Sequence, residues 1–192
     1  MFSGIINHLG AVVKRTGSVL EVKAKLKPKL GASIAINGVC LTVTKSKGGV
    51  LSFDVGPDTW ARTNLRAARR VNVEPSLRVG DEISGHFVAG HVDACAEVLA
   101  FAPWEKGFRR LRVATPPALR GLLPVKGSVA VDGVSLTVTA STPRFFEIML
   151  VPHTLEHTTL GRLKPGDRVN LEADPMARYA REALKGMTRD RA

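Results

Sequence analysis

The sequence is poor in cysteine. Only Cys40 and Cys95 occur in 192 residues, and neither belongs to a Cys-x-x-Cys or a Cys/His cluster. This pattern implies no disulfide framework and disfavours a structural zinc site, so we expect no metal. Both thiols are expected to be reduced, which favours a cytoplasmic protein.

Long apolar runs are missing as well. No run approaches the roughly 18–20 residues that span a bilayer. The first ten residues, MFSGIINHLG, lack the basic-then-apolar pattern of a secretory signal. The sequence therefore predicts no membrane partner.

Aromatic residues make up only 5% of the chain, with Tyr179 the single tyrosine, although the net charge is +11. So few stacking platforms argue against a nucleic-acid partner, despite the basic composition. The other interpretation is a solvated basic surface that keeps the protein soluble or attracts anionic metabolites.

A repeat is the strongest feature that the sequence does contain. Residues 33–44 read SIAINGVCLTVT and residues 128–139 read SVAVDGVSLTVT, with eight of the twelve pairs identical. Because further matches follow in the same order, the chain is a duplication. These further pairs are SGIIN at 3–7 with AGHVD at 89–93, Thr59 with Thr154, Thr63 with Thr158, and RVNVE at 70–74 with RVNLE at 168–172.

Each copy has the signature of β structure. Asn37-Gly38 and Asp132-Gly133 are flanked by alternating Val, Ile and Thr, and both predict two-residue type I′ hairpins. Several short strands in about 90 residues predict a closed antiparallel barrel, which leaves no sheet edge exposed. Further predicted strands cover residues 18–26, 50–55, 92–101, 109–114 and 145–151.

Helical structure is expected mainly at the end of the chain. Short turns are predicted after Pro57 and Pro152 and over residues 117–122. For the longer C-terminal helix, Asp174 suits the N-cap and Pro175 the first helical position. Its apolar stripe would pack against a barrel or against other subunits, and it comprises Met176, Tyr179, Ala183 and Met187.

Small polar pairs beside the two hairpins are candidate ligand contacts. Cys40 and Thr42 share one strand face, as do Ser135 and Thr137. Both copies keep such a pair with a thiol exchanged for a hydroxyl, which favours similar ligand groups at both sites. Thr44 and Thr139 are interpreted as ordinary strand residues.

Two histidines stand in SGHFVAGHVD, His86 and His91. No carboxylate or cysteine completes a metal set there. A neutral histidine near a substrate, acting as donor or acid/base, is the more natural role, and a structural bond to the backbone is the alternative for His86.

Taken together and in order, these motifs resemble the riboflavin synthase family over roughly residues 1–185. The resemblance is carried by MFSGII, NGVCLTV, SGHFVAGHVD, KGSVAVDGVSLTV, VPHTLEHTTLG and GDRVNLEADPMARYA. It implies an all-β protein of two tandem six-stranded Greek-key barrels plus a C-terminal helix. The boundaries would be residues 1–86, 87–174 and 175–192.

The resemblance also implies an activity. Two molecules of 6,7-dimethyl-8-ribityllumazine react, a four-carbon unit passes between them, and riboflavin and 5-amino-6-ribitylaminouracil leave, with no cofactor. A homotrimer with active sites between subunits is implied, and association with lumazine synthase is a further expectation. The alternative is a non-catalytic lumazine- or flavin-binding antenna protein of the same fold.

Site residues follow from the resemblance. The expected catalytic residues are His91, Ser135, Cys40 and Asp174. Phe2 is expected to cover the reacting rings. The substrate-binding set is Phe2, Gly4, Ile5, Ile6, Ser33, Cys40, Leu41, Thr42, Asp54, Val55, Gly56, Pro57, Asp58, Thr59, Gly90, His91 and Val92 from the first copy and its surroundings, with Lys126, Ser135, Leu136, Thr137, Val151, Pro152, His153, Thr154, Leu155 and Glu156 from the second.

Overall fold

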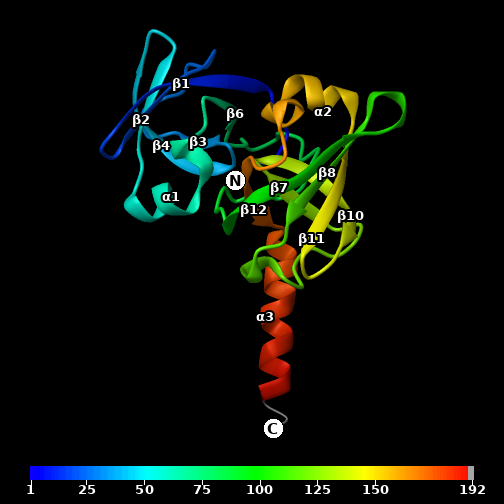
Figure 1. The fold of residues 1–192 in the computed structure, drawn as a ribbon. Helices are drawn as coiled ribbons and strands as arrows, with labels where there is room; N and C mark the ends of the chain where they lie inside the picture. Colours follow the sequence, from blue (N-terminus) through cyan, green and yellow to red (C-terminus); the bar gives the residue numbers. More distant parts are fainter. Residues whose placement is uncertain (190–192) are drawn as a thin grey trace.

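Two closed barrels stand side by side, and a long helix leads away from the second (Figure 1). The computed structural model describes residues 1–189, with side chains as far as residue 184. All strand pairs are antiparallel, so the expected pair of six-stranded barrels is confirmed.

The first barrel closes in the order β1-β2-β5-β4-β3-β6. The step from β2 to β5 makes it a Greek key, because neighbouring strands are not consecutive there. Helix α1 (Pro57–Arg62) and a single helical turn (Asn64–Arg66) connect β5 to β6. The strands are β1 (His8–Thr16), β2 (Val19–Lys23), β3 (Ser33–Ile36), β4 (Val39–Lys47), β5 (Val50–Asp54) and β6 (Arg70–Pro75).

The second barrel repeats this topology with β7-β8-β11-β10-β9-β12. Even the β-bulges recur, at Val12/Lys14 and Val98/Ala100 and again at Val43/Lys45 and Val138/Ala140. The duplication therefore extends to local irregularities of the strands. The strands are β7 (Ala94–Pro103), β8 (Arg109–Ala114), β9 (Ser128–Val131), β10 (Val134–Ser141), β11 (Phe145–Leu150) and β12 (Arg168–Ala173).

The predicted helical segments also form. Helix α2 (Pro152–His157) is the counterpart of α1, and the turn predicted over residues 117–122 covers Pro117–Leu119. Two further short turns, Glu105–Gly107 and Thr159–Arg162, complete the set. The last helix, α3 (Pro175–Arg189), is capped as expected, since the Met176 amide donates to Asp174 Oδ1 at 2.9 Å. Met176, Tyr179 and Ala183 of the predicted stripe are exposed, and the Met187 side chain lies outside the described residues.

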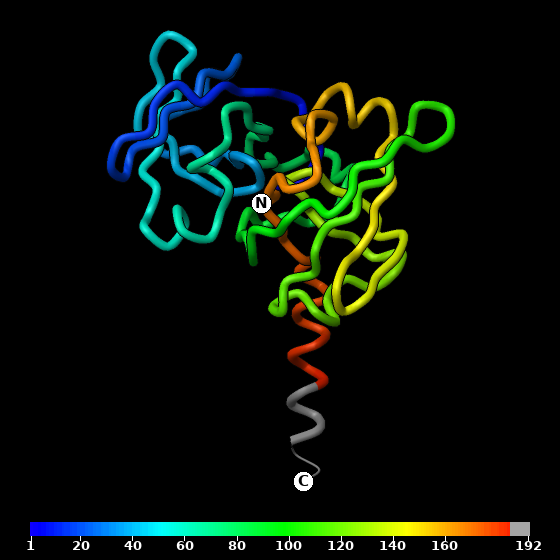
Figure 2. Tube along the Cα trace, in the orientation of Figure 1, coloured from blue at the N-terminus to red at the C-terminus, as the bar shows by residue number. Residues whose placement is uncertain are grey.

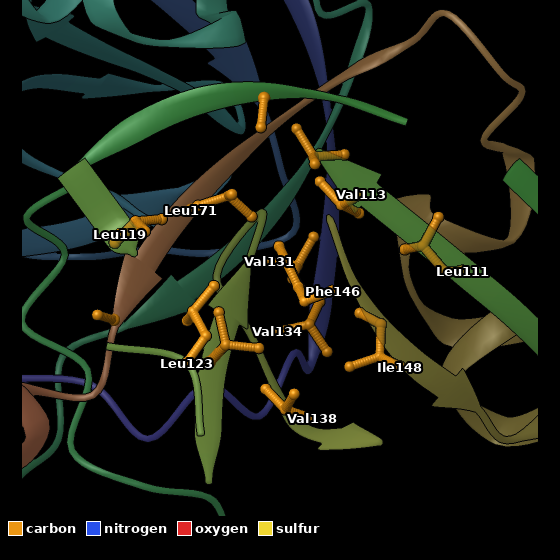
Figure 3. Close-up of a cluster of buried hydrophobic side chains, with 14 of the residues drawn as sticks. Leu111, Val113, Leu119, Leu123, Val131, Val134, Val138, Phe146, Ile148 and Leu171 are labelled. Carbon is orange, nitrogen blue, oxygen red and sulfur yellow. The ribbon is translucent and has the colours of Figure 1, made fainter. Parts of the chain in front are cut away.

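Each barrel interior is filled by its own apolar side chains. Leu20, Leu51 and Phe53 are completely buried in the first barrel, and Leu111, Phe146 and Ile148 are completely buried in the second (Figure 3). Because the alternating strands send these side chains inward, each barrel forms a packed core. Ligands must therefore bind on the outer surfaces.

The two hairpins meet tip to tip at the junction of the barrels. Asn37, Gly38, Asp132 and Gly133 all have positive φ, from 46° to 79°, which confirms the type I′ turns. A Cβ atom on Gly38 would lie 2.7 Å from the Gly133 backbone nitrogen. Glycine is thus required twice over, by conformation and by close approach.

Asparagines surround this contact with crossed hydrogen bonds. The side-chain amide of Asn72 donates to the Asp132 carbonyl, and the side-chain amide of Asn170 donates to the Asn37 carbonyl, each at 2.9 Å. Asn64 donates to Asp132 Oδ1 at 2.8 Å. Burial raises the pKa of Asp132 to about 7 against these donors. The network satisfies polar groups that the inter-barrel contact buries.

Two chain segments exchange between the barrels. Residues 1–6 precede the first barrel, yet Ile6 packs against the core of the second; Val92 precedes the second barrel and packs against the first. Phe2 and Val88 pair between them as an antiparallel bridge. Figure 2 shows the chain start at this junction. We refer to residues 1–6 and 86–92 as the bridging segments.

We predict that Gly38→Ala destabilises the protein by about 3 kcal/mol or more. Alanine is strained at this positive φ, and its Cβ atom would also clash with the backbone of Gly133. Gly17→Ala is the matched control, since Gly17 has φ +59° with open space around it. It should cost only about 1 kcal/mol. Urea unfolding measures both; equal losses would show that the hairpin contact contributes nothing.

Candidate functional site

The expected contact residues lie along the outer edges of the two barrels. In the first barrel Ser33 pairs with Thr42 across β3 and β4, and the equivalent pair in the second is Ser128 with Thr137. Thr42 and Thr137 are both exposed. Thr44 and Thr139 each donate to a strand carbonyl at 3.1 Å, so their structural role is confirmed.

Several apolar members of the expected set face inward. Leu41 and Val55 belong to the core of the first barrel, and Leu136 packs against the core of the second. Their side chains fill the barrels, so only their backbone groups are available at the edge. Strand-edge amides and carbonyls suit the recognition of a polar ring.

Cys40 and Ser135 occupy equivalent places beneath the bridging segments. The Cys40 amide donates to the Gly90 carbonyl at 2.9 Å, and the Ser135 amide donates to the Gly4 carbonyl at 2.8 Å. A Cβ atom on Gly90 would lie 2.6 Å from the Cys40 Cβ, and one on Gly4 would lie 2.7 Å from the Ser135 Cβ. Both glycines have positive φ. The bridging segments therefore fit only as glycine backbone.

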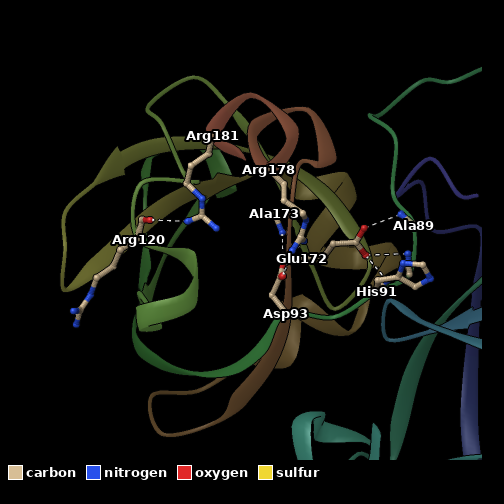
Figure 4. Close-up of polar contacts among 9 residues, drawn as sticks. Ala89, His91, Asp93, Arg120, Glu172, Ala173, Arg178 and Arg181 are labelled. Carbon is tan, nitrogen blue, oxygen red and sulfur yellow. Dashed lines mark hydrogen bonds and ion pairs between the residues drawn. The ribbon is translucent and has the colours of Figure 1, made fainter. Parts of the chain in front are cut away.

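Buried carboxylates hold these segments in place. Glu172 accepts from the amides of Ala89, Gly90 and His91 at 2.7–2.9 Å (Figure 4). Glu74 accepts equivalent bonds from Ser3 and Gly4. Burial raises the pKa of both carboxyls, while the amide donors oppose that shift. Neither carboxylate is predicted from the sequence, although each Glu ends a repeated RVN-x-E motif.

His86 is the partner of Ser135. Its Nδ1 lies 2.7 Å from Ser135 Oγ. Burial lowers the pKa of His86, with the Asp174 carboxylate opposing the shift. The imidazole is therefore neutral at pH 7 and can exchange a proton with the hydroxyl. Within the described residues, the buried Nε2 of His86 has no hydrogen-bond partner.

One expectation needs correction. Phe2 does not cover a ligand site, because its side chain is completely buried in an inter-barrel cluster with Val88, Ala35 and Ala130. The expected backbone bond of His86 is made by its amide, which donates to the Ser3 carbonyl at 3.1 Å, whereas its ring contacts Ser135. His91 itself is exposed, and its amide donates to Glu172 at 2.9 Å. The five-residue spacing of His86 and His91 in a loop does not indicate which of the two contacts Ser135.

Asp174 stands where the second barrel joins α3. Its carboxylate caps the helix and also acts on His86 through its charge. The helix start is fixed by Arg178, which pairs with Asp93 at 2.7 Å, while Asp93 also accepts from the Ala173 amide (Figure 4). Asp174 thus has both a structural position and an electrostatic effect on the Ser135–His86 pair.

Residues 54–59 and 151–156 lead into α1 and α2. Thr63 and Thr158 donate to the carbonyls of Thr59 and Thr154, both at 2.7 Å, which explains why this threonine repeats. Asp58 pairs with Arg62 at 2.7 Å. Its counterpart His153 stacks on His157 with ring centroids 4.0 Å apart. The two segments share a backbone conformation but differ in side-chain chemistry.

Lys126 adopts a conformation that lysine disfavours. Its φ is +71°, and the equivalent residue of the first barrel is Gly31 with φ +80°. Both amides make the same bond, to the Val138 and Val43 carbonyls. The left-handed region costs a residue with a Cβ atom about 1–2 kcal/mol. A strained lysine at the edge of the expected second site points to a ligand role.

A cavity of about 510 Å³ lies at the edge of the first barrel, lined by Ser33 together with Lys27, Lys29 and Arg78. That volume is within the usual range for small-molecule sites. A larger cavity of about 990 Å³ lies between the barrels and contains none of the expected residues. Among the described residues, no group of three or more His, Cys, Asp or Glu side chains could hold a metal.

Helices of the described chain are all too short or too polar to cross a membrane. The fold and these edges define a duplicated Greek-key barrel protein whose two edges share a backbone and differ in side-chain chemistry. A family model, "Lumazine binding domain", matches residues 3–76 and 89–174.

Curated relatives extend over the whole chain. Riboflavin synthase of Brucella abortus is 40% identical over 94% of this chain and 96% of its own. Riboflavin synthase of Mycobacterium tuberculosis is 38% identical over 96% of this chain and 98% of its own. The chain therefore belongs to the riboflavin synthase family, with two lumazine-binding domains.

Solved structures show the same fold. LumP complexed with 6,7-dimethyl-8-(1'-D-ribityl) lumazine is 22% identical with a TM-score of 0.77, and LumP complexed with riboflavin is 23% identical with a TM-score of 0.79. Each likeness covers 90% of this chain and 99% of the other.

We predict that Lys126→Gly stabilises the fold by about 0.5–1 kcal/mol, since relief of strain exceeds the added chain entropy. The same variant should bind 6,7-dimethyl-8-ribityllumazine more weakly. Gly31→Lys is the matched control and should destabilise the first barrel. Urea unfolding and fluorescence titration measure these effects; unchanged binding by Lys126→Gly would remove the ligand role of this lysine.

Proposed function

We propose that this protein catalyses the dismutation of two 6,7-dimethyl-8-ribityllumazine molecules to riboflavin and 5-amino-6-ribitylaminouracil. The observation that carries the proposal is the pair of related barrel edges in a chain of the riboflavin synthase family. One chain thus offers two surfaces for one kind of molecule. The two substrates contain all the atoms of the two products, so no external oxidant or reductant is needed.

Placement supplies much of the acceleration in this scheme. Holding two reactants in register can lower a barrier by roughly 7–11 kcal/mol. The substrates are activated ring systems, and the methyl group at C7 is acidic. A strong base is therefore unnecessary, which agrees with a site built from hydroxyl, thiol and imidazole groups.

Ser135 is the polar group that we assign to the second barrel's reacting edge. Neutral His86 holds its hydroxyl at 2.7 Å and can take up or return its proton. Asp174 favours the charged form of His86 and so moderates the effect of burial on its pKa. Cys40 is the first-barrel counterpart, and exposed His91 is available to a ligand or to a neighbouring chain.

The reacting pair forms between subunits in this proposal. Figure 1 shows α1 and α2, which border the two candidate edges, well apart on different barrels, and this arrangement supports pairing between chains. Met176, Tyr179 and Leu184 expose 63–75% of their surface on α3, which suits packing against other copies. A homotrimer would pair a first-barrel site with a second-barrel site of a neighbour.

The resemblance also favours action in the cytoplasm, where the free thiols of Cys40 and Cys95 would persist. Association with lumazine synthase rests on the resemblance alone and stays a prediction.

A non-catalytic binding protein is the second candidate, because the LumP complexes share the fold. Their identity of 22–23% is well below the 38–40% of the riboflavin synthases. The second barrel also keeps Ser135, Thr137 and Thr154 at its edge, which favours the enzyme.

We predict that the purified protein converts 6,7-dimethyl-8-ribityllumazine to riboflavin without added metal or cofactor. Ser135→Ala and His86→Ala should each lower kcat by about 100-fold with a smaller effect on binding, as expected when proton transfer is lost. The double variant should be little worse than either single one, because the two groups act together. Absorbance and chromatography follow both products.

Cys40→Ser is the matched control, since it places the second-barrel group in the first barrel, and it should retain most activity. His91→Ala should slow turnover more than it weakens binding. Tight lumazine binding without riboflavin over hours would instead support the binding protein. Weakened binding with unchanged kcat would contradict the role of the Ser135–His86 pair.

A further inference from the structure

The large cavity between the barrels, which we call the inter-barrel groove, has no role in the proposed reaction. It measures about 990 Å³ and is lined by the loops that follow α1 and α2, within residues 60–70 and 158–168. These loops are equivalent parts of the two repeats. The groove therefore lies where the duplication brings its own copies face to face.

Arginine dominates the groove. Arg66, Arg69 and Arg70 come from the first repeat, and Arg162 and Arg168 from the second, all exposed. The carboxylates that line it are Asp132 and Asp167. Asp132 is buried and accepts from Asn64, and Asp167 accepts from the Lys164 amide. The guanidinium charges thus exceed the carboxylate charges around the cavity.

Two buried donors in the groove are left without partners. Trp60 is 4% exposed, and within the described residues its indole Nε1 has no hydrogen bond. The Thr159 hydroxyl is likewise buried and unpaired. Both residues line the groove. Both atoms are shielded from solvent, so a ligand in the groove would reach the arginines of its wall rather than these two donors.

The walls also include an aromatic and an apolar part. The Arg66 guanidinium lies 5.1 Å from the centroid of the Trp60 ring. Leu9, Ala67 and Leu163 add apolar surface. Guanidinium groups match phosphate oxygens in pairs, and a cavity of this size holds a molecule of nucleotide dimensions.

We propose that the inter-barrel groove binds a small phosphate-bearing molecule of nucleotide size, at a site separate from the lumazine edges. Its phosphate oxygens accept from arginines of both repeats. The ligand would bridge the two barrels. The clustering of arginine here also gives part of the positive charge of the chain a specific purpose.

Tryptophan fluorescence provides a direct test. The chain has two tryptophans, so Trp104→Phe, on an exposed loop, leaves Trp60 as the reporter. Titration of this variant with pyrophosphate and with ADP should give saturable changes that weaken with added salt. Tighter binding of ADP identifies a nucleotide as the ligand class, whereas equal affinity assigns the site to the diphosphate group alone.

Arginine variants locate the site. In the same background, Arg66→Ala with Arg162→Ala should weaken pyrophosphate binding by about tenfold or more. Lys47→Ala with Arg144→Ala removes the same charge at exposed positions outside the groove and should change it less than about twofold. Urea unfolding confirms that both double variants are folded, and lumazine turnover should be the same in both.

The proposal is overturned by the absence of a saturable Trp60 signal with either probe. It is equally overturned if both double variants lose affinity alike, which would show general charge attraction. Tighter binding of a twelve-nucleotide single strand than of ADP would also contradict a small-molecule site. None of these results bears on the dismutation, which uses other residues.

Discussion

The tip-to-tip contact of the two hairpins is the constraint on which the rest of the structure depends. Gly38 and Gly133 let the backbones approach so closely that a side chain on either would clash. Once the tips meet, Asn37, Asn72 and Asn170 must satisfy the buried polar groups around them. The contact also sets the barrels at a spacing that the bridging segments can cross, which in turn places glycine backbone over Cys40 and Ser135.

Duplication of the backbone with divergence of the side chains is the principle of the candidate sites. The same amide positions are held by Glu74 in one half and by Glu172 in the other, so the frames are alike. The side chains at equivalent positions differ. Cys40 of the first half corresponds to Ser135, whose hydroxyl bonds to His86, and Gly31 corresponds to the strained Lys126. In the proposed reaction, two unequal sites for one kind of molecule would let one ligand act as donor and the other as acceptor.

Much of the fold follows from sequence because the repeat, the hairpin dipeptides and the strand alternation are local signals. Asp174 and Pro175 likewise predict the start of α3 correctly. Contacts between distant segments leave no such signal. The burial of Phe2 and the choice of His86 over His91 as the partner of Ser135 depend on the exchange of bridging segments between barrels. The inter-barrel groove depends on two loops about 95 residues apart, and only the unexplained basic charge of the sequence pointed toward it.

The central claim is that each chain carries two unequal lumazine sites, one on each barrel. Calorimetric titration with a ribityllumazine that lacks the C7 methyl group tests this most directly, because that compound binds without reacting. The account predicts two molecules bound per chain with separable affinities. A single molecule per chain at saturation would contradict it, since one of the two barrels would then serve the fold alone.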